Sequence, residues 1–289
     1  MARGRSSAGE PSAFAGKTAI VTGGASGIGI ALGAELATRG CRVTLADIDG
    51  EAAERAASGF GSINARELDT RDEGRFRALV DEISDRDGAI DFLFNNAGIS
   101  MGGPTDELTR AHWDRIIDVN IRGVVNGALA TYPRMVEQGH GHIVNTASGA
   151  GLAPPPFVTP YATTKHAVVG LSTGLRSEAA LHGVRISVLC PGSVETPILD
   201  RPPDADLPAT ASEPVTARQY LETVRQKPVP AARFASRALD QIARNRSVIV
   251  VPTAAKSLWY LQRLSPRLMD YVGGTIARRV QRDLVRPRR

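Results

Sequence analysis

Short apolar segments and helical segments alternate along most of this chain, and that alternation restricts the fold more than any single motif. The apolar segments lie at residues 17–22, 42–46, 62–68, 90–94, 142–146, 184–189 and 247–251. The first helical segment between them ends at Arg39, and the next ones cover 50–58, 72–86, 113–138 and 161–182. Strands that are apolar throughout are typical of a sheet buried on both faces. The pattern therefore predicts an α/β fold, a doubly wound parallel sheet of about seven strands with helices on both faces.

Ligands of a doubly wound sheet bind beyond the carboxyl ends of its strands, so the residues that follow each strand are candidates for a site. The first strand runs directly into the sequence TGGASGIG, residues 22–29. Its glycines are spaced GxxxGxG at a strand-to-helix turn, where they let the backbone approach a pyrophosphate at the positive end of the helix dipole. A simple tight turn is the alternative interpretation of this segment.

Asp47 closes the second strand, eighteen residues after Gly29, where a carboxylate can accept hydrogen bonds from the ribose hydroxyls of adenosine. The same carboxylate would repel a 2′-phosphate, and neither Ile48 nor the glycine segment supplies a compensating Arg or Lys. The sequence therefore predicts NAD as the cofactor, with NADP less favoured. The alternative role for Asp47, in a turn and helix cap, is compatible with cofactor binding.

Tyr161 and Lys165 are four residues apart in a predicted helix, so they share one face about one turn apart. A tyrosine hydroxyl with a pKa of ~10 is a poor acid or base at neutral pH, but a neighbouring ammonium stabilises the phenolate and lowers the pKa. The pair indicates a general acid/base, with Ser148 as a second hydroxyl in the preceding loop. Such a pair alone is also common on a solvated helix face.

Six features occur in one order along the chain: TGGASGIG, NNAG at 95–98, Asn120, Ser148, YATTK at 161–165 and PGSVET at 191–196. In this combination the chain resembles the short-chain dehydrogenase/reductase family over about residues 15–251. The resemblance implies a Rossmann-like sheet and a tyrosine general acid/base at Tyr161. It implies that Lys165 lowers the pKa of Tyr161 and holds the nicotinamide ribose, and that Ser148 orients the substrate oxygen.

The resemblance also implies that Asn120 anchors a water in the proton relay and that Thr196 lies near the nicotinamide carboxamide. Simpler roles remain open: Asn120 bonding backbone inside a helix, Ser148 capping a loop, and residues 191–196 forming a turn. The predicted catalytic residues are Asn120, Ser148, Tyr161 and Lys165. The predicted cofactor-binding residues are Gly23, Ser26, Gly27, Ile28, Gly29, Asp47, Asp69, Thr70, Asn96, Gly98, Tyr161, Lys165, Val194 and Thr196.

Length and composition indicate one domain with appendages, since 289 residues with 42% hydrophobic content can bury one large core. We expect a disordered leader at 1–14, a single catalytic domain at 15–252 and a substrate lid at about 197–230. The two cysteines, Cys41 and Cys190, lie in separate apolar segments and form no metal-binding cluster, so no metal is expected. With no signal peptide and no apolar run of ~20 residues, we expect a cytoplasmic protein.

The net charge of +5 is concentrated at the C-terminal end, where residues 256–289 hold nine Lys and Arg against two Asp. The main body is therefore not basic, and no nucleic-acid surface is expected. Residues 253–289 read as a basic amphipathic helical extension, interrupted at Pro266 and at Gly273-Gly274. We favour packing of this extension over the substrate cleft or a neighbouring subunit. The alternative is a weak peripheral contact with an anionic membrane.

The sequence as a whole predicts an NAD-dependent oxidoreductase that interconverts a secondary alcohol and a ketone. The apolar loop LAPPPFV at 152–158 and the extension favour an apolar substrate. Two alternatives are an NADPH-preferring carbonyl reductase and a catalytically silent dinucleotide-binding sensor or scaffold. The family resemblance also implies a homo-oligomer, a dimer or tetramer, assembled through the helices at 113–138 and 161–182.

Overall fold

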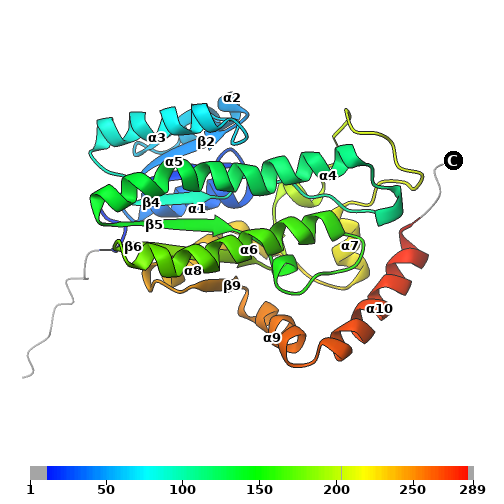
Figure 1. Ribbon diagram of the computed structural model, residues 1–289. Helices are drawn as coiled ribbons and strands as arrows, with labels where there is room; N and C mark the ends of the chain where they lie inside the picture. Colours follow the sequence, from blue (N-terminus) through cyan, green and yellow to red (C-terminus); the bar gives the residue numbers. More distant parts are fainter. Residues whose placement is uncertain (1–11, 203, 286–289) are drawn as a thin grey trace, which may run out of the picture.

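A single parallel sheet forms the centre of the protein (Figure 1). The structure, a computed structural model, describes residues 12–202 and 204–285. Seven strands lie in the order β3-β2-β1-β4-β5-β6-β9, and every neighbouring pair is parallel. They are β1 Thr18–Thr22, β2 Arg42–Asp47, β3 Ile63–Glu67, β4 Phe92–Asn95, β5 Gly141–Thr146, β6 Val184–Pro191 and β9 Val248–Val251. The predicted doubly wound parallel sheet is confirmed. From β1 to β3 successive strands are added on one side of β1, and from β4 onward they are added on its other side, so the order reverses between β1 and β4.

Helices cover both faces of the sheet because each supplies one apolar side to it. The first face carries α1 Gly27–Thr38, α2 Gly50–Ala57 and α8 Ala231–Ala243. The second carries α3 Glu73–Asp87, α5 Gly123–Gln138 and α6 Thr159–Ala180. The strands β1, β4 and β6 inside the sheet are consequently buried at nearly every position, which is the reason for their continuous apolar sequence, whereas the edge strand β3 is buried only at Ile63.

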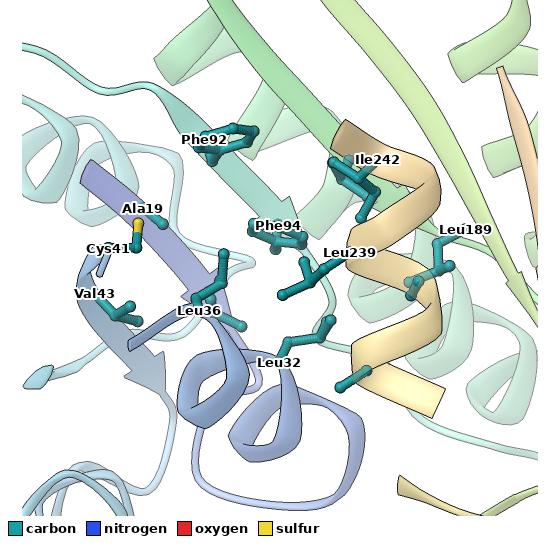
Figure 2. Packing of buried hydrophobic residues seen from close by; sticks show 14 of the residues in the cluster. Ala19, Leu32, Leu36, Cys41, Val43, Phe92, Phe94, Leu189, Leu239 and Ile242 are labelled. Atoms are coloured by element: carbon teal, nitrogen blue, oxygen red, sulfur yellow. The ribbon is translucent and has the colours of Figure 1, made fainter. Parts of the chain in front are cut away.

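The core on the first face lies between the sheet and the helices α1 and α8. Figure 2 shows Leu32 and Leu36 of α1 and Leu239 and Ile242 of α8 converging on Phe94 of β4. Phe14 belongs to the same core: it is fully buried, and its ring centre lies 5.1 Å from that of Phe92. The predicted disordered leader at 1–14 therefore extends too far at its C-terminal end, since burial of an aromatic ring repays the ordering of its backbone. Residues 1–11 lie outside the described residues.

The predicted helix at 113–138 is three elements: α4 Arg110–Ile117, a π-helical turn Asp118–Arg122 and α5. The turn centres on Asn120, whose side chain is fully buried and bonds the backbone of Ile99. A π-turn widens the helix by one residue, and such turns are frequent at functional sites. Periodicity could not predict this break because all three elements have helical spacing.

The segment between β6 and β9 leaves the sheet and returns to it. Its two ends are joined by a small parallel sheet of β7 Val194–Glu195 and β8 Val229–Pro230, which the sequence did not predict. Between them lie the turn Pro197–Leu199 and the helix α7 Ala217–Thr223. The pairing of β7 with β8 therefore holds together the two ends of the segment predicted as a lid at about 197–230.

Two helices follow β9, α9 Lys256–Leu264 and α10 Pro266–Asp283, and they confirm the helical extension. They form a V whose corner points away from the sheet, and α10 contacts α7 (Figure 1). The predicted break at Pro266 is present. The predicted break at Gly273-Gly274 is wrong: α10 continues through both glycines, because an isolated glycine pair weakens a packed helix without ending it. Among the described residues, no helix is long and apolar enough to cross a membrane.

Candidate functional site

The glycine segment lies at the carboxyl edge of the sheet, where β1 turns into α1. Gly23 and Gly27 have positive φ angles of 63° and 54°, which side chains rarely adopt. A Cβ at Gly29 would overlap the carbonyl oxygen of Gly23, so only glycine lets the helix approach the loop this closely. Ser26 caps α1 without a side-chain hydrogen bond, which leaves its hydroxyl and the first backbone N–H groups directed to a ligand.

Asp47 stands beside this loop at the end of β2. Its Oδ2 accepts a hydrogen bond of 3.0 Å from the Ala25 backbone N–H, and its Oδ1 accepts one of 3.1 Å from Asp49. These bonds fix the orientation of the carboxylate and leave lone pairs on both oxygens. The turn role of Asp47 is therefore present, but the cap of the following helix α2 is Asp49 rather than Asp47. The Asp47 carboxylate lines the cleft, and its contact with a ribose stays a prediction.

A cleft of about 730 Å³ connects the glycine segment to the tyrosine and lysine. It is lined by these predicted site residues: Gly23, Ser26, Gly27, Ile28, Asp47, Asp69, Thr70, Asn96, Gly98, Tyr161, Lys165 and Thr196. The glycine loop, the start of α1 and the Asp47 carboxylate along this cleft fit the binding of an adenine dinucleotide. Residues far apart in the sequence thus meet at the edge that the topology predicted.

Two predicted cofactor-binding residues, Val194 and Gly29, do not line the cleft, and their backbone contacts with a cofactor stay predictions. Val194 packs in the core with α8 and is 4% exposed, because β7 turns its side chain inward. Gly29 lies beneath the loop, where it permits close packing against Gly23, and does not line the cleft. The sequence motif placed both residues near the cofactor but could not assign the direction that each faces.

Tyr161 and Lys165 face one another at the inner end of the cleft. The Lys165 Nζ lies 5.7 Å from the centre of the Tyr161 ring and donates a 3.0 Å hydrogen bond to the Thr146 carbonyl. Lys165 is 3% exposed, and burial lowers its pKa from 10.5 to about 8. A solvated surface pair is therefore excluded.

The pKa of Tyr161 is raised rather than lowered, contrary to the effect expected from Lys165. Burial of the phenol is the largest cause, a hydrogen bond with the Ser148 side chain acts in the lowering direction, and Cys190 adds a smaller raising effect. Loss of hydration therefore dominates, and Lys165 is not among the causes of the shift. The spacing predicted the contact correctly but not the balance of these effects.

Ser148 stands next to both Tyr161 and the buried thiol of Cys190. Its Oγ accepts a 3.1 Å hydrogen bond from the Ala150 N–H, which is the loop-capping role that remained open, and it also bonds Tyr161. Cys190 in β6 is fully buried, and burial raises its pKa to about 12. Cys190 therefore remains a neutral thiol behind the site.

Asn120 connects the loop after β4 to α6. Its Nδ2 donates to the Ile99 carbonyl at 3.0 Å and to the Thr164 Oγ1 at 3.1 Å, and its Oδ1 accepts from the Ile99 N–H at 2.9 Å. The Thr164 hydroxyl in turn donates to the Tyr161 carbonyl at 2.8 Å. Both amide hydrogens of Asn120 are therefore used within the protein, in the structural role that remained open, and the water-anchoring role stays a prediction.

Asp69 lines the cleft and is tied to Arg71. The Arg71 guanidinium donates to both carboxylate oxygens at 2.6–3.0 Å, and this pairing lowers the pKa of Asp69. Arg71 also lines the cleft, so its charge there is compensated by Asp69. The sequence analysis missed this arginine, although its position two residues after Asp69 was a local signal.

A second group of charged residues, which was not predicted, joins α4 to the segment after residue 199. Arg115 of α4 forms ion pairs with Asp204, at 2.7 Å, and with Asp206. Arg201 reaches the same Asp204 at 3.2 Å. Arg115, Arg201 and Asp204 all line the cleft, so the segment after residue 199 is held across it. No local sequence signal could have paired residues so far apart along the chain.

The sequence and the fold of this chain are similar to those of known proteins. The family model for short chain dehydrogenases matches residues 17–205. Levodione reductase of Leifsonia aquatica is 34% identical over 194 residues, 65% of this chain and 73% of that protein. The 2,5-dichloro-2,5-cyclohexadiene-1,4-diol dehydrogenase of Sphingobium indicum is 40% identical over 197 residues, 67% of this chain and 78% of that protein.

A solved structure agrees over a longer span. The short-chain dehydrogenase/reductase from Burkholderia phymatum in complex with NAD superposes with a TM-score of 0.79 at 32% identity, over 88% of this chain and 95% of that one. The fold and the cleft together define an oxidoreductase with a dinucleotide-binding sheet. The chain belongs to the short-chain dehydrogenase family, whose members here are dehydrogenases and reductases acting on CH–OH groups.

Proposed function

We propose that the protein is an NAD-dependent oxidoreductase that interconverts a secondary alcohol and a ketone, with Tyr161 as general acid/base. The observation that carries the proposal is the meeting of Tyr161, Ser148 and the buried Lys165 at the inner end of a cleft whose outer end holds Asp47. A silent binding protein would have no need to bury a lysine beside a tyrosine, since burial of an ammonium is costly.

When bound, NAD supplies the hydride acceptor for the alcohol carbon. Side chains of the protein then position the substrate and transfer its proton. Ser148 holds the substrate oxygen, and the Tyr161 hydroxyl takes the proton from an alcohol or returns it to a ketone. Lys165, fixed by its bond to the Thr146 carbonyl, places a positive charge beside the ring and donors toward the nicotinamide ribose. The first turn of α1 and Gly27 would hold the pyrophosphate.

Asp47 supports the preference for NAD over NADP. A carboxylate fixed by Ala25 accepts from ribose hydroxyls and repels a 2′-phosphate. The neighbouring Ile48 is 63% exposed and brings no charge. Arg71 is already paired with Asp69. A thermal-shift titration with NAD and with NADP tests this preference, and tighter binding of NADP would favour the carbonyl-reductase alternative.

An apolar substrate is supported by the loop between Ser148 and α6. Leu152 packs in the core and is a structural residue. Phe157 and Val158 are half-buried against Gly102, where the Phe157 carbonyl accepts a 2.7 Å bond from the Gly103 N–H. Ile99 lines the cleft, and Phe157 and Val158 add apolar side chains in the loop beside Gly102 and Gly103.

The reaction is tested by following NADH formation across a panel of secondary alcohols. We expect the Tyr161→Phe variant to lose about 10²- to 10⁴-fold in kcat, the usual contribution of a positioned acid/base, while NAD binding persists. Tyr132→Phe on α5 is a matched control that keeps full activity. An unchanged rate in Tyr161→Phe would contradict the mechanism. NAD binding without turnover of any alcohol by the wild type would favour the sensor or scaffold alternative.

We also propose a cytoplasmic homo-oligomer. Two free buried cysteines suit a reducing compartment. Leu129 on α5 is 52% exposed, which supports assembly through the predicted helices. Light scattering of the purified protein tests the assembly, and a monomer mass at micromolar concentration would contradict it.

A further inference from the structure

The corner between α9 and α10 exposes apolar side chains to an unusual degree. Nine large hydrophobic residues are exposed among the described residues, and five of them lie in these two helices: Leu258, Tyr260, Leu264, Leu268 and Tyr271. Leu264 at the end of α9 is 83% exposed and Tyr271 is 71% exposed. We call Tyr260, Leu264, Leu268 and Tyr271 the apolar corner. Concentrated exposure of this kind marks an interaction surface rather than scattered surface residues.

The opposite side of α10 is already used for packing. Val280 is 1% exposed, and α10 contacts α7 of the lid segment. The corner itself lies at the end of the V that points away from the sheet (Figure 1). The packing that we favoured from the sequence therefore accounts for the inner face of the extension and leaves its corner unexplained.

The charges around the apolar corner are basic. Lys256, Arg263 and Arg267 have no carboxylate partner among residues 12–202 and 204–285, and Arg263 instead lies over the Trp259 ring at 5.6 Å. Asp270 is the nearby acidic residue. Apolar side chains flanked by unpaired cations match the layered chemistry of an anionic bilayer, with hydrocarbon below and phosphate above.

A second copy of the chain fits this surface less well. In a twofold contact the same patch meets itself, so the cations of one copy would approach those of the other. One Asp per patch leaves that contact with an excess of positive charge. Anionic lipid headgroups supply the missing negative charge without such repulsion.

We propose that the apolar corner docks the enzyme on an anionic membrane surface, inserting Leu264 and Leu268 while Arg263 and Arg267 bind lipid phosphates. The contact is peripheral, since no described helix spans a bilayer. It adjoins the lid through α10, so an apolar substrate dissolved in the membrane would reach the lid directly. The access of a membrane-dissolved substrate rests on the proposed function, whereas the docking on the membrane does not.

The test is co-sedimentation of the full chain with phosphatidylglycerol/phosphatidylcholine vesicles and with phosphatidylcholine vesicles. We expect the wild type to pellet with the anionic vesicles. Leu264→Glu should weaken this binding roughly ten-fold or more, because a leucine that inserts into the bilayer is replaced by a charged side chain. Thr275→Glu, which adds the same charge to an exposed site on α10, is the matched control and should weaken it far less. Arg263→Gln with Arg267→Gln should cost roughly five-fold per residue on anionic vesicles alone.

Three outcomes would overturn the proposal. The wild type stays in the supernatant with both vesicle types, or Leu264→Glu and Thr275→Glu weaken binding equally. In the third, Leu264→Glu lowers the molecular mass measured by light scattering, which would assign the corner to contact between copies. None of these readouts requires turnover, so a failure of the proposed reaction would be seen separately.

Discussion

The ammonium of Lys165 lies 5.7 Å from the centre of the Tyr161 ring, inside the protein rather than on its surface. Both groups are perturbed by burial, in the direction that favours their neutral forms: the pKa of Lys165 falls to about 8 and that of Tyr161 rises. At neutral pH the phenol is neutral whether the chain is folded or unfolded, so the cost to folding comes from burying the charged Lys165. Such costs are typical of functional sites, and they have measurable consequences.

The first prediction concerns stability and pH. Because the folded pKa of Lys165 is lowered from 10.5 to about 8, the unfolded chain binds more protons between these values. Stability from this group therefore rises as the pH rises from about 8 to about 10.5, by about 3 kcal/mol in all. Lys165→Met should remove that rise and be more stable than the wild type at pH 7. Lys227→Met, at an exposed site, should keep it.

Denaturant unfolding at pH 7 to 9.5 checks this, taking the difference between variant and wild type. The difference cancels the opposite effect of the buried thiols, whose raised pKa values make stability fall as the pH rises above about 9. If the free energies of unfolding of Lys165→Met and the wild type change in parallel with pH, Lys165 is not a buried charged group.

The second prediction concerns the direction of the reaction. Since burial raises the pKa of Tyr161, the phenolate needed to accept a proton from an alcohol becomes more abundant as the pH rises. The oxidation rate should therefore increase from pH 6 to 9, and ketone reduction, which needs the protonated phenol, should not. Initial rates in both directions over this range are the measurement. A reduction rate that increases with pH would argue against Tyr161 as the acid.

The third prediction concerns the glycine segment. Gly29→Ala places a methyl group against the Gly23 carbonyl, which forces α1 away from the loop. We expect a loss of roughly 1–3 kcal/mol in stability, typical of overpacking, together with weaker NAD binding. Gly59→Ala is the control, because nothing lies within 4 Å of its Cβ. Equal melting temperatures and NAD affinities for the two variants would contradict the close packing.

The fourth prediction concerns the discrimination between cofactors. Replacing Asp47 by Ser and Ile48 by Arg removes the repulsion of a 2′-phosphate and adds a cation beside it. NAD binding should weaken and NADP binding strengthen, each by roughly ten-fold or more, equivalent to about 1.4 kcal/mol. Calorimetric titration with both nucleotides gives the ratio. If the ratio does not change, Asp47 does not face the ribose.

The fifth prediction concerns the ion pairs that hold the lid segment. Arg115→Gln removes the partner of Asp204 and Asp206, at a site where the arginine is 26% exposed. We expect the KM for NAD to rise several-fold, because the segment no longer stays across the cleft. Arg110→Gln breaks an exposed pair with Asp114 on the same helix and should leave KM unchanged, as surface pairs contribute little.

High salt should mimic the Arg115 change in the wild type and have little effect on Arg115→Gln, because screening weakens the same pairs. Steady-state kinetics with NAD varied at low and high salt provides both readouts. A KM for NAD that is identical in Arg115→Gln and Arg110→Gln would show that the segment is held by other contacts.

Several parts of the fold and the site could be predicted from local patterns. The apolar strands, the helical spacing between them and the position of Asp47 after β2 each depend on neighbouring residues, and the structure has them as expected. The exceptions arise where packing overrides local preference. Phe14 is ordered because its ring is buried, and α10 passes through Gly273-Gly274 because propensity alone does not end a packed helix.

The direction of a side chain was less predictable than its position. Val194 and Thr196 are neighbours in one motif, but the first packs under α8 and the second lines the cleft. Asn120 was recognised, but not the π-turn around it or its bonds to Ile99. These properties depend on which partners the fold brings near, and no partner of Asn120 lies close to it in the sequence.

The sequence by itself determined the parallel sheet, the edge at which a dinucleotide would bind and the residues proposed to carry the chemistry, because periodicity and motif spacing are local properties. The tertiary structure decided the rest. It reversed the expected shift of the Tyr161 pKa, since burial depends on the whole surrounding core. It also joined Arg115 to Asp204 and left the apolar corner uncovered, since contacts between distant segments depend on how the chain is folded back on itself.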